Sequence, residues 1–160
     1  MTNIRISKVS DLATARACAA LNINYIGLNL THGSPNAISP IKVNDYIQWL
    51  SGIEVVAQAH HLDEVKAQKF MDLLNLKHVE ILSENYVTGG KGFWYYGDNV
   101  EDVNGTIVSL NQNNKGYFVV TDLENISVNQ THIDLPITLF EQDEGINWEL
   151  VDQVISKLKK

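Results

Sequence analysis

An α/β fold built on a parallel sheet is the class that the sequence predicts. Short apolar stretches alternate along the whole chain with longer stretches whose apolar residues recur about every three to four positions. Such an alternation of strands and helices calls for right-handed crossovers between parallel strands. The length of 160 residues suits one domain with a sizeable core, so residues 1–160 are expected to form a single unit.

About seven strands are expected from these apolar stretches. Residues 3–7 alternate, with Ile4 and Ile6 on one face and Arg5 and Ser7 on the other. The full set of expected strands is 3–7, 25–30, 54–59, 78–82, 93–96, 117–121 and 137–140. Seven strands are one fewer than a complete eight-stranded barrel contains. We therefore expect an incomplete TIM (β/α)8-like barrel that lacks its last βα unit, with a flavodoxin-like open sheet as the alternative.

Helices are expected where apolar residues at helical spacing follow a capping residue. Ser10-Asp11, Ser39-Pro40 and Asn147 are such starts, and the stripe over 62–73 marks another helix. A further helix is predicted from a stripe at Val100, Val103, Ile107 and Leu110. Residues 123–134 have no sustained stripe and are expected to form a loop or one irregular turn.

The composition excludes several functional classes. A net charge of −7 argues against broad binding to nucleic acid or to anionic membranes. The N-terminus has no long apolar run, which suits a cytoplasmic protein, and the single Cys18 excludes an internal disulfide. His60 and His61 are adjacent, so on a strand end they point to opposite faces, and no metal or cofactor is predicted.

Residues 25–40 are the most informative stretch, because they combine a strand, a polar loop and a Ser39-Pro40 helix start. This loop, GSPNAISP, is similar to the Ser-Pro-Arg-x-Ile-Ser-Pro loop of phosphoribosylanthranilate isomerase, a (β/α)8-barrel enzyme of tryptophan biosynthesis. Arg5-Ile6-Ser7, followed by Val9-Ser10-Asp11-Leu12, is similar to the opening Lys-Ile-Cys-Gly-Ile-Thr of that family. The resemblance is good over the first half of the chain and weaker afterwards.

The resemblance implies a set of site residues, several of which depart from the family pattern. The family catalyses an Amadori rearrangement with a cysteine base and an aspartate acid. Ser7 stands where that cysteine would be, and a serine hydroxyl has no accessible anion near neutral pH. Asn36 stands where the family has a substrate-binding arginine, and an amide does not replace a bidentate donor. The positions implied are Ser7 and Asp122 for catalysis, and Arg5, Asn36, Glu80 and Gly145 for substrate binding.

Other departures lie in the fourth strand and in a later loop. Glu80 begins a stretch that replaces a histidine-containing motif of the family. Residues 141–145, EQDEG, replace a phosphate-binding Gly-Gly, and their acidic side chains would repel a phosphate.

Three functions are consistent with these observations. The first is a divergent isomerase-like protein, a pseudoenzyme, that binds a small metabolite, phosphorylated or not, or acts through protein contacts. The second is an active phosphoribosylanthranilate or sugar-phosphate isomerase. The third is an assembly subunit, since a missing last βα unit would leave a strand edge through which a homodimer could pair.

Overall fold

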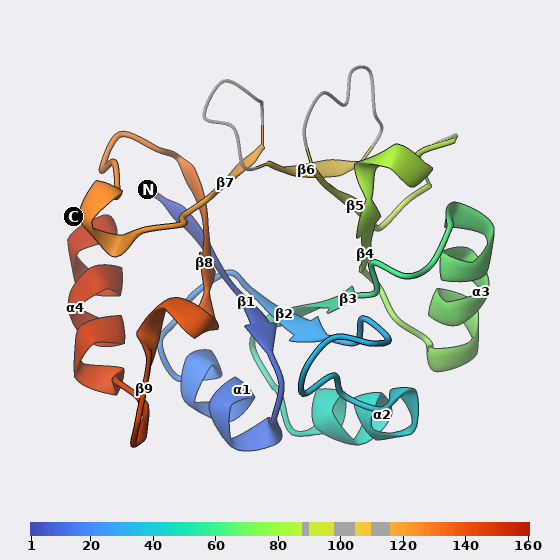
Figure 1. Cartoon of the computed structure of the whole chain (residues 1–160), viewed down its shortest axis with the longest axis horizontal. Helices are drawn as coiled ribbons and strands as arrows, with labels where there is room; N and C mark the ends of the chain where they lie inside the picture. The colour runs from blue at the N-terminus through green and yellow to red at the C-terminus, as the bar shows by residue number, and fades with distance from the viewer. Residues whose placement is uncertain (88–89, 98–104, 110–115) are drawn as a thin grey trace.

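Eight parallel strands form a closed barrel in chain order (Figure 1). The computed structural model describes residues 1–87, 90–97, 105–109 and 116–160. The strands are β1 (Asn3–Val9), β2 (Tyr25–Asn29), β3 (Glu54–Gln58), β4 (Val79–Leu82), β5 (Phe93–Tyr96), β6 (Thr106–Ser109), β7 (Tyr117–Val119) and β8 (His132–Pro136). The predicted α/β class with parallel strands is confirmed, and the open sheet is not what forms.

The prediction that the last strand is missing is wrong. Thr106–Ser109 forms β6 where a helix was expected, while Val100, Val103 and Leu110 of that predicted stripe lie outside the described residues. His132–Pro136 forms β8 largely within a predicted loop, and the predicted strand Ile137–Phe140 is a 3-10 helix, η3. Strands this short contain too few residues for periodicity to separate them from a helical turn.

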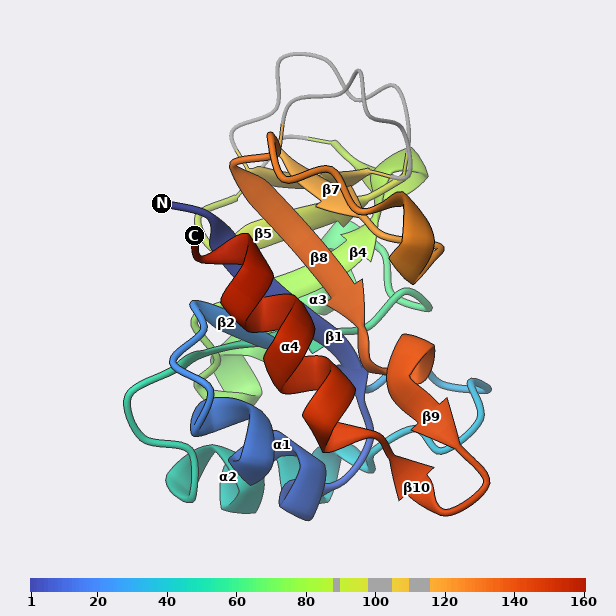
Figure 2. The same cartoon turned by 90° about the vertical axis from the view of Figure 1, so that its left-hand side faces the viewer.

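Closure of the barrel removes the edge on which the predicted dimer depended. β1 pairs with β8 in parallel register, from Asn3 opposite His132 to Ser7 opposite Pro136. Figure 2 shows α4 packed against the outer side of this pair of strands. A barrel without its last strand would expose β1 and β7. Both pair with β8, so neither is an exposed edge.

The α-helices of the described residues cover only part of the barrel. The described residues contain four α-helices: α1 (Leu12–Ala19), α2 (Pro40–Gln48), α3 (Glu64–Leu74) and α4 (Trp148–Leu158). The predicted starts are confirmed, since Asp11 accepts a hydrogen bond from Thr14 N, and Asn147 accepts one from Leu150 N. Between α3 and α4, the only helices in the described part of the chain are the 3-10 helices η1 (Ser83–Asn85), η2 (Leu123–Asn125) and η3. A hairpin of β9 (Glu141–Gln142) and β10 (Gly145–Ile146) precedes α4. In the residues that the structure describes, the barrel therefore has all eight strands but only four α-helices around them.

The two faces of the strands have different partners. Ile4, Ile6 and the buried Cys18 belong to the apolar core between the strands and the helices. Inside the barrel, Trp94 packs on Tyr25 and on Tyr117, with ring centroids 4.9 Å and 5.2 Å apart. Tyr25 and Tyr117 begin β2 and β7, so this aromatic cluster lies toward the N-terminal ends of the strands. Of the polar side chains described next, Ser7, Lys8 and Gln58 lie near the C-terminal ends of β1 and β3. In the described part of the chain, no helix is long and apolar enough to cross a membrane.

Candidate active site

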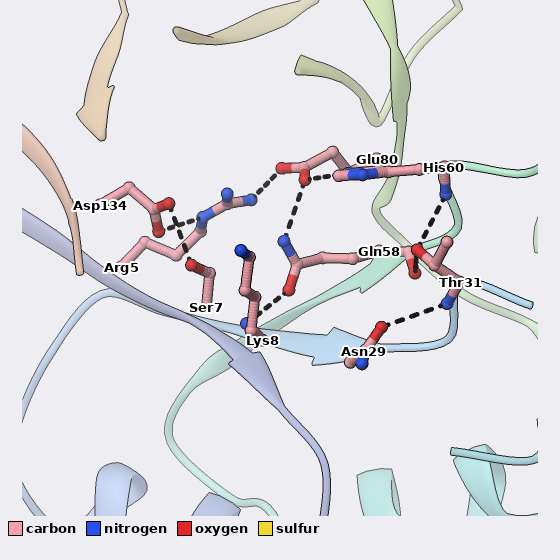
Figure 3. Close-up of polar contacts among 9 residues, drawn as sticks. All are labelled: Arg5, Ser7, Lys8, Asn29, Thr31, Gln58, His60, Glu80 and Asp134. Carbon is pink, nitrogen blue, oxygen red and sulfur yellow. Dashed lines mark hydrogen bonds and ion pairs between the residues drawn. The ribbon is translucent and has the colours of Figure 1, made fainter. Parts of the chain in front are cut away.

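A fully buried arginine lies at the centre of the barrel. Arg5 of β1 donates through Nε to Asp134 of β8 at 2.9 Å, and through Nη1 to Glu80 of β4 (Figure 3). Its guanidinium also lies over the ring of Trp94, with Cζ 5.0 Å from the ring centroid. The remaining nitrogen, Nη2, is buried and has no hydrogen-bond partner in the described structure. The barrel interior thus holds a buried cation between two carboxyl groups, above an aromatic cluster.

Glu80 accepts hydrogen bonds from three neighbours. Besides Arg5, Gln58 of β3 donates through Nε2 at 3.0 Å, and His60 contacts the same carboxylate oxygen through Nε2 at 2.7 Å. Burial favours the protonated acid, but the charge of Arg5 and the contacts with His60 and Gln58 outweigh it and lower the pKa of Glu80 to about 2. Glu80 is therefore a carboxylate at neutral pH.

Asp134 differs from Glu80 although it shares the same arginine. Its carboxyl accepts from Arg5 and from the hydroxyl of Ser7, at 3.0 Å. Burial raises the pKa of Asp134, and the attraction of Arg5 does not offset this. The two groups differ in their surroundings. Glu80 also contacts His60 and Gln58, whereas Asp134 accepts a serine hydroxyl and its pKa is raised further by the negative charge of Glu80.

The end of β1 is distorted at Lys8. From Ile6 to Val9, β1 uses one residue more than the segment Ile26–Leu28 of β2 with which it pairs, so the strand has a bulge there. Lys8 has φ of +59°, a backbone conformation that is unfavourable for a residue with a Cβ. Its backbone N–H donates to Gln58 Oε1 at 2.7 Å, so the Gln58 amide fixes this conformation. The side chain is exposed, and in Figure 3 it points toward the buried network.

His60 follows β3 at the C-terminal mouth of the barrel, the end where the strands finish. Its backbone N–H donates to Thr31 Oγ1 at 3.1 Å, and its ring stacks on Tyr96 with a centroid distance of 4.9 Å. The side chain is 20% exposed, whereas that of its partner Glu80 is fully buried. His61 points elsewhere, since its Nδ1 accepts from the backbone N–H of His32. A positioned imidazole therefore lies between the buried carboxylate and the solvent.

The predicted site residues fall into three places. Arg5, Ser7 and Glu80 come together in the barrel interior. Asn36 and Gly145 instead line a separate cleft of about 650 Å³, together with the start of α1 and the β9–β10 hairpin. Asp122 lies after β7, is exposed, and accepts from Glu124 N at the start of η2. The hydrogen bonds of Asp122 therefore lie within its own turn.

Two assignments within the family comparison change with the strand count. Asp122 was compared with an aspartate that ends the sixth strand in the family, but the strand that precedes Asp122 is β7, and the sixth strand ends at Ser109. The acidic segment 141–145 was compared with the family's loop after the seventh strand, but it follows β8 and therefore belongs to the region after the eighth strand. Both shifts follow from the helix that was predicted where β6 forms.

Four members of the site were not predicted from the sequence. Gln58 and Asp134 each lie between two apolar residues of the sequence, a pattern that marks side chains facing a polar interior. His60 was considered only as a metal ligand, and Lys8 occupies the place of the glycine in the Lys-Ile-Cys-Gly motif. Within residues 1–87, 90–97, 105–109 and 116–160, no three His, Cys, Asp or Glu side chains are grouped to hold a metal ion.

Comparison with known proteins gives a match at the level of structure. No protein-family model matches the sequence, and no curated protein matches it. Phosphoribosylanthranilate isomerase from Thermus thermophilus superposes with a TM-score of 0.75 at 13% identity, over 99% of this chain and 98% of that chain. A monomeric form of the dimeric isomerase from Thermotoga maritima gives 0.74 at 14% identity, over 99% of both chains.

A third similar structure contains a ligand. It is a phosphoribosylanthranilate isomerase in complex with reduced 1-(o-carboxyphenylamino)-1-deoxyribulose 5-phosphate, and it gives a TM-score of 0.75 at 12% identity, over 99% of both chains. Identities this low carry no information about activity, but the similarity extends over nearly the whole chain. The protein therefore has the fold of the phosphoribosylanthranilate isomerases.

Proposed function

We propose that this protein binds a small anionic metabolite at the C-terminal mouth of the barrel, without the residues on which the family's isomerase reaction depends. The observation that supports it most directly is Lys8, an exposed lysine held in an unfavourable backbone conformation beside the polar network. Strained residues cluster at functional sites, where the surrounding structure fixes them. Here Gln58 does so through the hydrogen bond that it accepts from Lys8 N.

The polar interior supports binding better than the family's chemistry. The Ser7 hydroxyl donates to the buried Asp134 carboxyl, which Arg5 also contacts, so its proton is directed into this buried ion pair and not toward a ligand at the mouth. Arg5 is buried and engaged by two carboxyl groups, which leaves it little capacity to hold a substrate anion. Asn36 lies in the separate cleft. Among the described residues of this network, Lys8 is a cation whose side chain is exposed and available to a ligand.

Ligand-induced stabilisation tests this proposal. Reduced 1-(o-carboxyphenylamino)-1-deoxyribulose 5-phosphate and inorganic phosphate are the probes. At a ligand concentration about ten times the dissociation constant, binding adds about 1.4 kcal/mol of stability, which is about 3–5 °C in melting temperature. The Lys8→Ala variant should lose this shift, whereas Lys42→Ala, which removes an exposed lysine of α2, should keep it. Absence of any shift with millimolar probe in the unmodified protein would contradict the proposal.

A further inference from the structure

His60 and Glu80 form a pair that the binding proposal does not use. Glu80 is fully buried and ionised, so both of its oxygens are hydrogen-bond acceptors only. The contact of 2.7 Å between Glu80 Oε1 and His60 Nε2 therefore requires the proton to be on Nε2. In the neutral imidazole this leaves Nδ1 unprotonated, with a lone pair available to accept a proton.

The environment of His60 favours proton transfer with a ligand. Nδ1 makes no hydrogen bond with the part of the chain that the structure describes, and the ring is partly exposed at the barrel mouth. Stacking on Tyr96 and the bond from His60 N to Thr31 hold the residue at both ends. A base of this kind, oriented by a carboxylate on its other nitrogen, has the arrangement found in general-base catalysis.

Lys8 adds a positive charge to the same region. Its backbone is joined to Gln58, the Gln58 amide to Glu80, and Glu80 to His60, so the two residues belong to one continuous network. Figure 3 shows the Lys8 side chain directed toward this network from β1. A cation close to a base stabilises an oxygen anion formed when a proton leaves the carbon next to a carbonyl group.

We propose that His60, with Glu80 as its positioning residue, removes a proton from the hydroxyl-bearing carbon next to the carbonyl of a small hydroxy-ketone bound at the mouth. This inference rests on the proposed binding function and names its substrate class. The proton-accepting residue, His60, was not implied by the family resemblance, which named Glu80 only for substrate binding. His60 follows β3 and Glu80 lies in β4, and neither Ser7 nor Asp122 takes part.

The reaction balances without an external oxidant or reductant. His60 Nδ1 takes the carbon-bound proton, the C–H electron pair forms a carbon–carbon double bond, and the carbonyl pair moves to oxygen. The resulting enediolate oxygen faces the Lys8 ammonium. Return of the proton to the former carbonyl carbon, with passage of the hydroxyl proton to the enediolate oxygen, gives the isomeric hydroxy-aldehyde. One carbon is oxidised and its neighbour is reduced.

Solvent-proton exchange measures this step even where no net product accumulates. The full-length protein is incubated in D₂O with ribulose 5-phosphate or with ribulose, and loss of the proton signal next to the carbonyl is followed by NMR against buffer alone. The two probes differ only in the phosphate, so their comparison shows whether that group is recognised. We expect exchange above the buffer rate, and a loss of about 10²–10⁴-fold in His60→Gln.

The adjacent histidine provides the matched control. His61→Gln removes an imidazole that contacts the His32 backbone, and it should change the exchange rate by less than about twofold. Should His60→Gln fail to fold, His60→Asn is used, and binding of the reduced deoxyribulose phosphate confirms a folded pocket in each variant. Exchange that persists in the His60 variant overturns the inference.

Two further outcomes separate the inference from the binding proposal. If the unmodified protein binds the reduced deoxyribulose phosphate but exchanges neither ribulose probe, the proton-transfer role is wrong and binding stands. If it neither binds nor exchanges, both are wrong.

Discussion

Replacing Lys8 with glycine should separate the stability of the protein from its binding function. A residue with a Cβ in the left-handed region costs about 1–2 kcal/mol, and glycine adopts it without that cost. Glycine also raises the conformational entropy of the unfolded chain, which reduces the gain in stability by about 0.4–1 kcal/mol. Because Lys8 is exposed, no packing is lost. Lys8→Gly should therefore stabilise the fold by about 0.5–1 kcal/mol, or about 2 °C, and abolish anion binding.

Thermal melts with and without the reduced deoxyribulose phosphate measure both effects. Lys8→Ala removes the charge but keeps the backbone conformation, so it should lose binding without gaining stability. Asn75→Gly changes another residue of positive φ, at the end of α3, and should leave binding unchanged. A glycine variant that melts below the original protein, or that binds the probe as the original does, would refute the reasoning about Lys8.

Two further predictions concern the network beneath Lys8. A Cβ at Gly27 would lie 2.7 Å from Gln58 Oε1 and 3.2 Å from Ser7 Cα, so Gly27→Ala should displace the amide, release Lys8 N and weaken binding, as titration of the probe would show. Glu80 has a pKa of about 2 in the folded state against an ordinary value of 4.5, so its contribution is complete above about pH 4.5 and is lost as the pH falls toward 2. Removing it with Glu80→Gln should therefore cost on the order of 3 kcal/mol at pH 7 and progressively less below pH 4.5, as measured by urea unfolding. A cost that is the same at pH 7 and pH 3 would contradict the assignment of the shift to Glu80.

The sequence predicted the first half of the fold better than the second half, for a physical reason. The strands up to β4 are separated by capped helices, and a cap such as Asp11 or Ser39 is a local signal. Between Leu82 and Asn147 the described residues contain no α-helix. The strands there are therefore not separated by capped helices that would mark where each strand begins and ends. A four-residue strand such as Thr106–Ser109 then carries no periodicity that excludes a helix.

The candidate site was predicted only in part, because its members are joined by contacts between distant strands. Arg5, Ser7 and Glu80 were named through the family resemblance, and the structure brings them together. The partners that define their chemistry, Asp134 and His60, are not spaced from them in any regular way in the sequence. The left-handed backbone conformation of Lys8 could not be predicted from the residue type either, because glycine or asparagine is usual at such positions and lysine is not.

The position of Arg5 also has a consequence for how the chain folds. Glu80 and Asp134 are 75 and 129 residues away from it, so a growing chain presents this cation long before either carboxyl group has been synthesised. Burying an unpaired guanidinium is strongly unfavourable, and the N-terminal strand cannot be fully enclosed until β8 docks beside it. Closure of the barrel and completion of the site should thus be a single late event, slowed by the long sequence separation of the contacts that it requires.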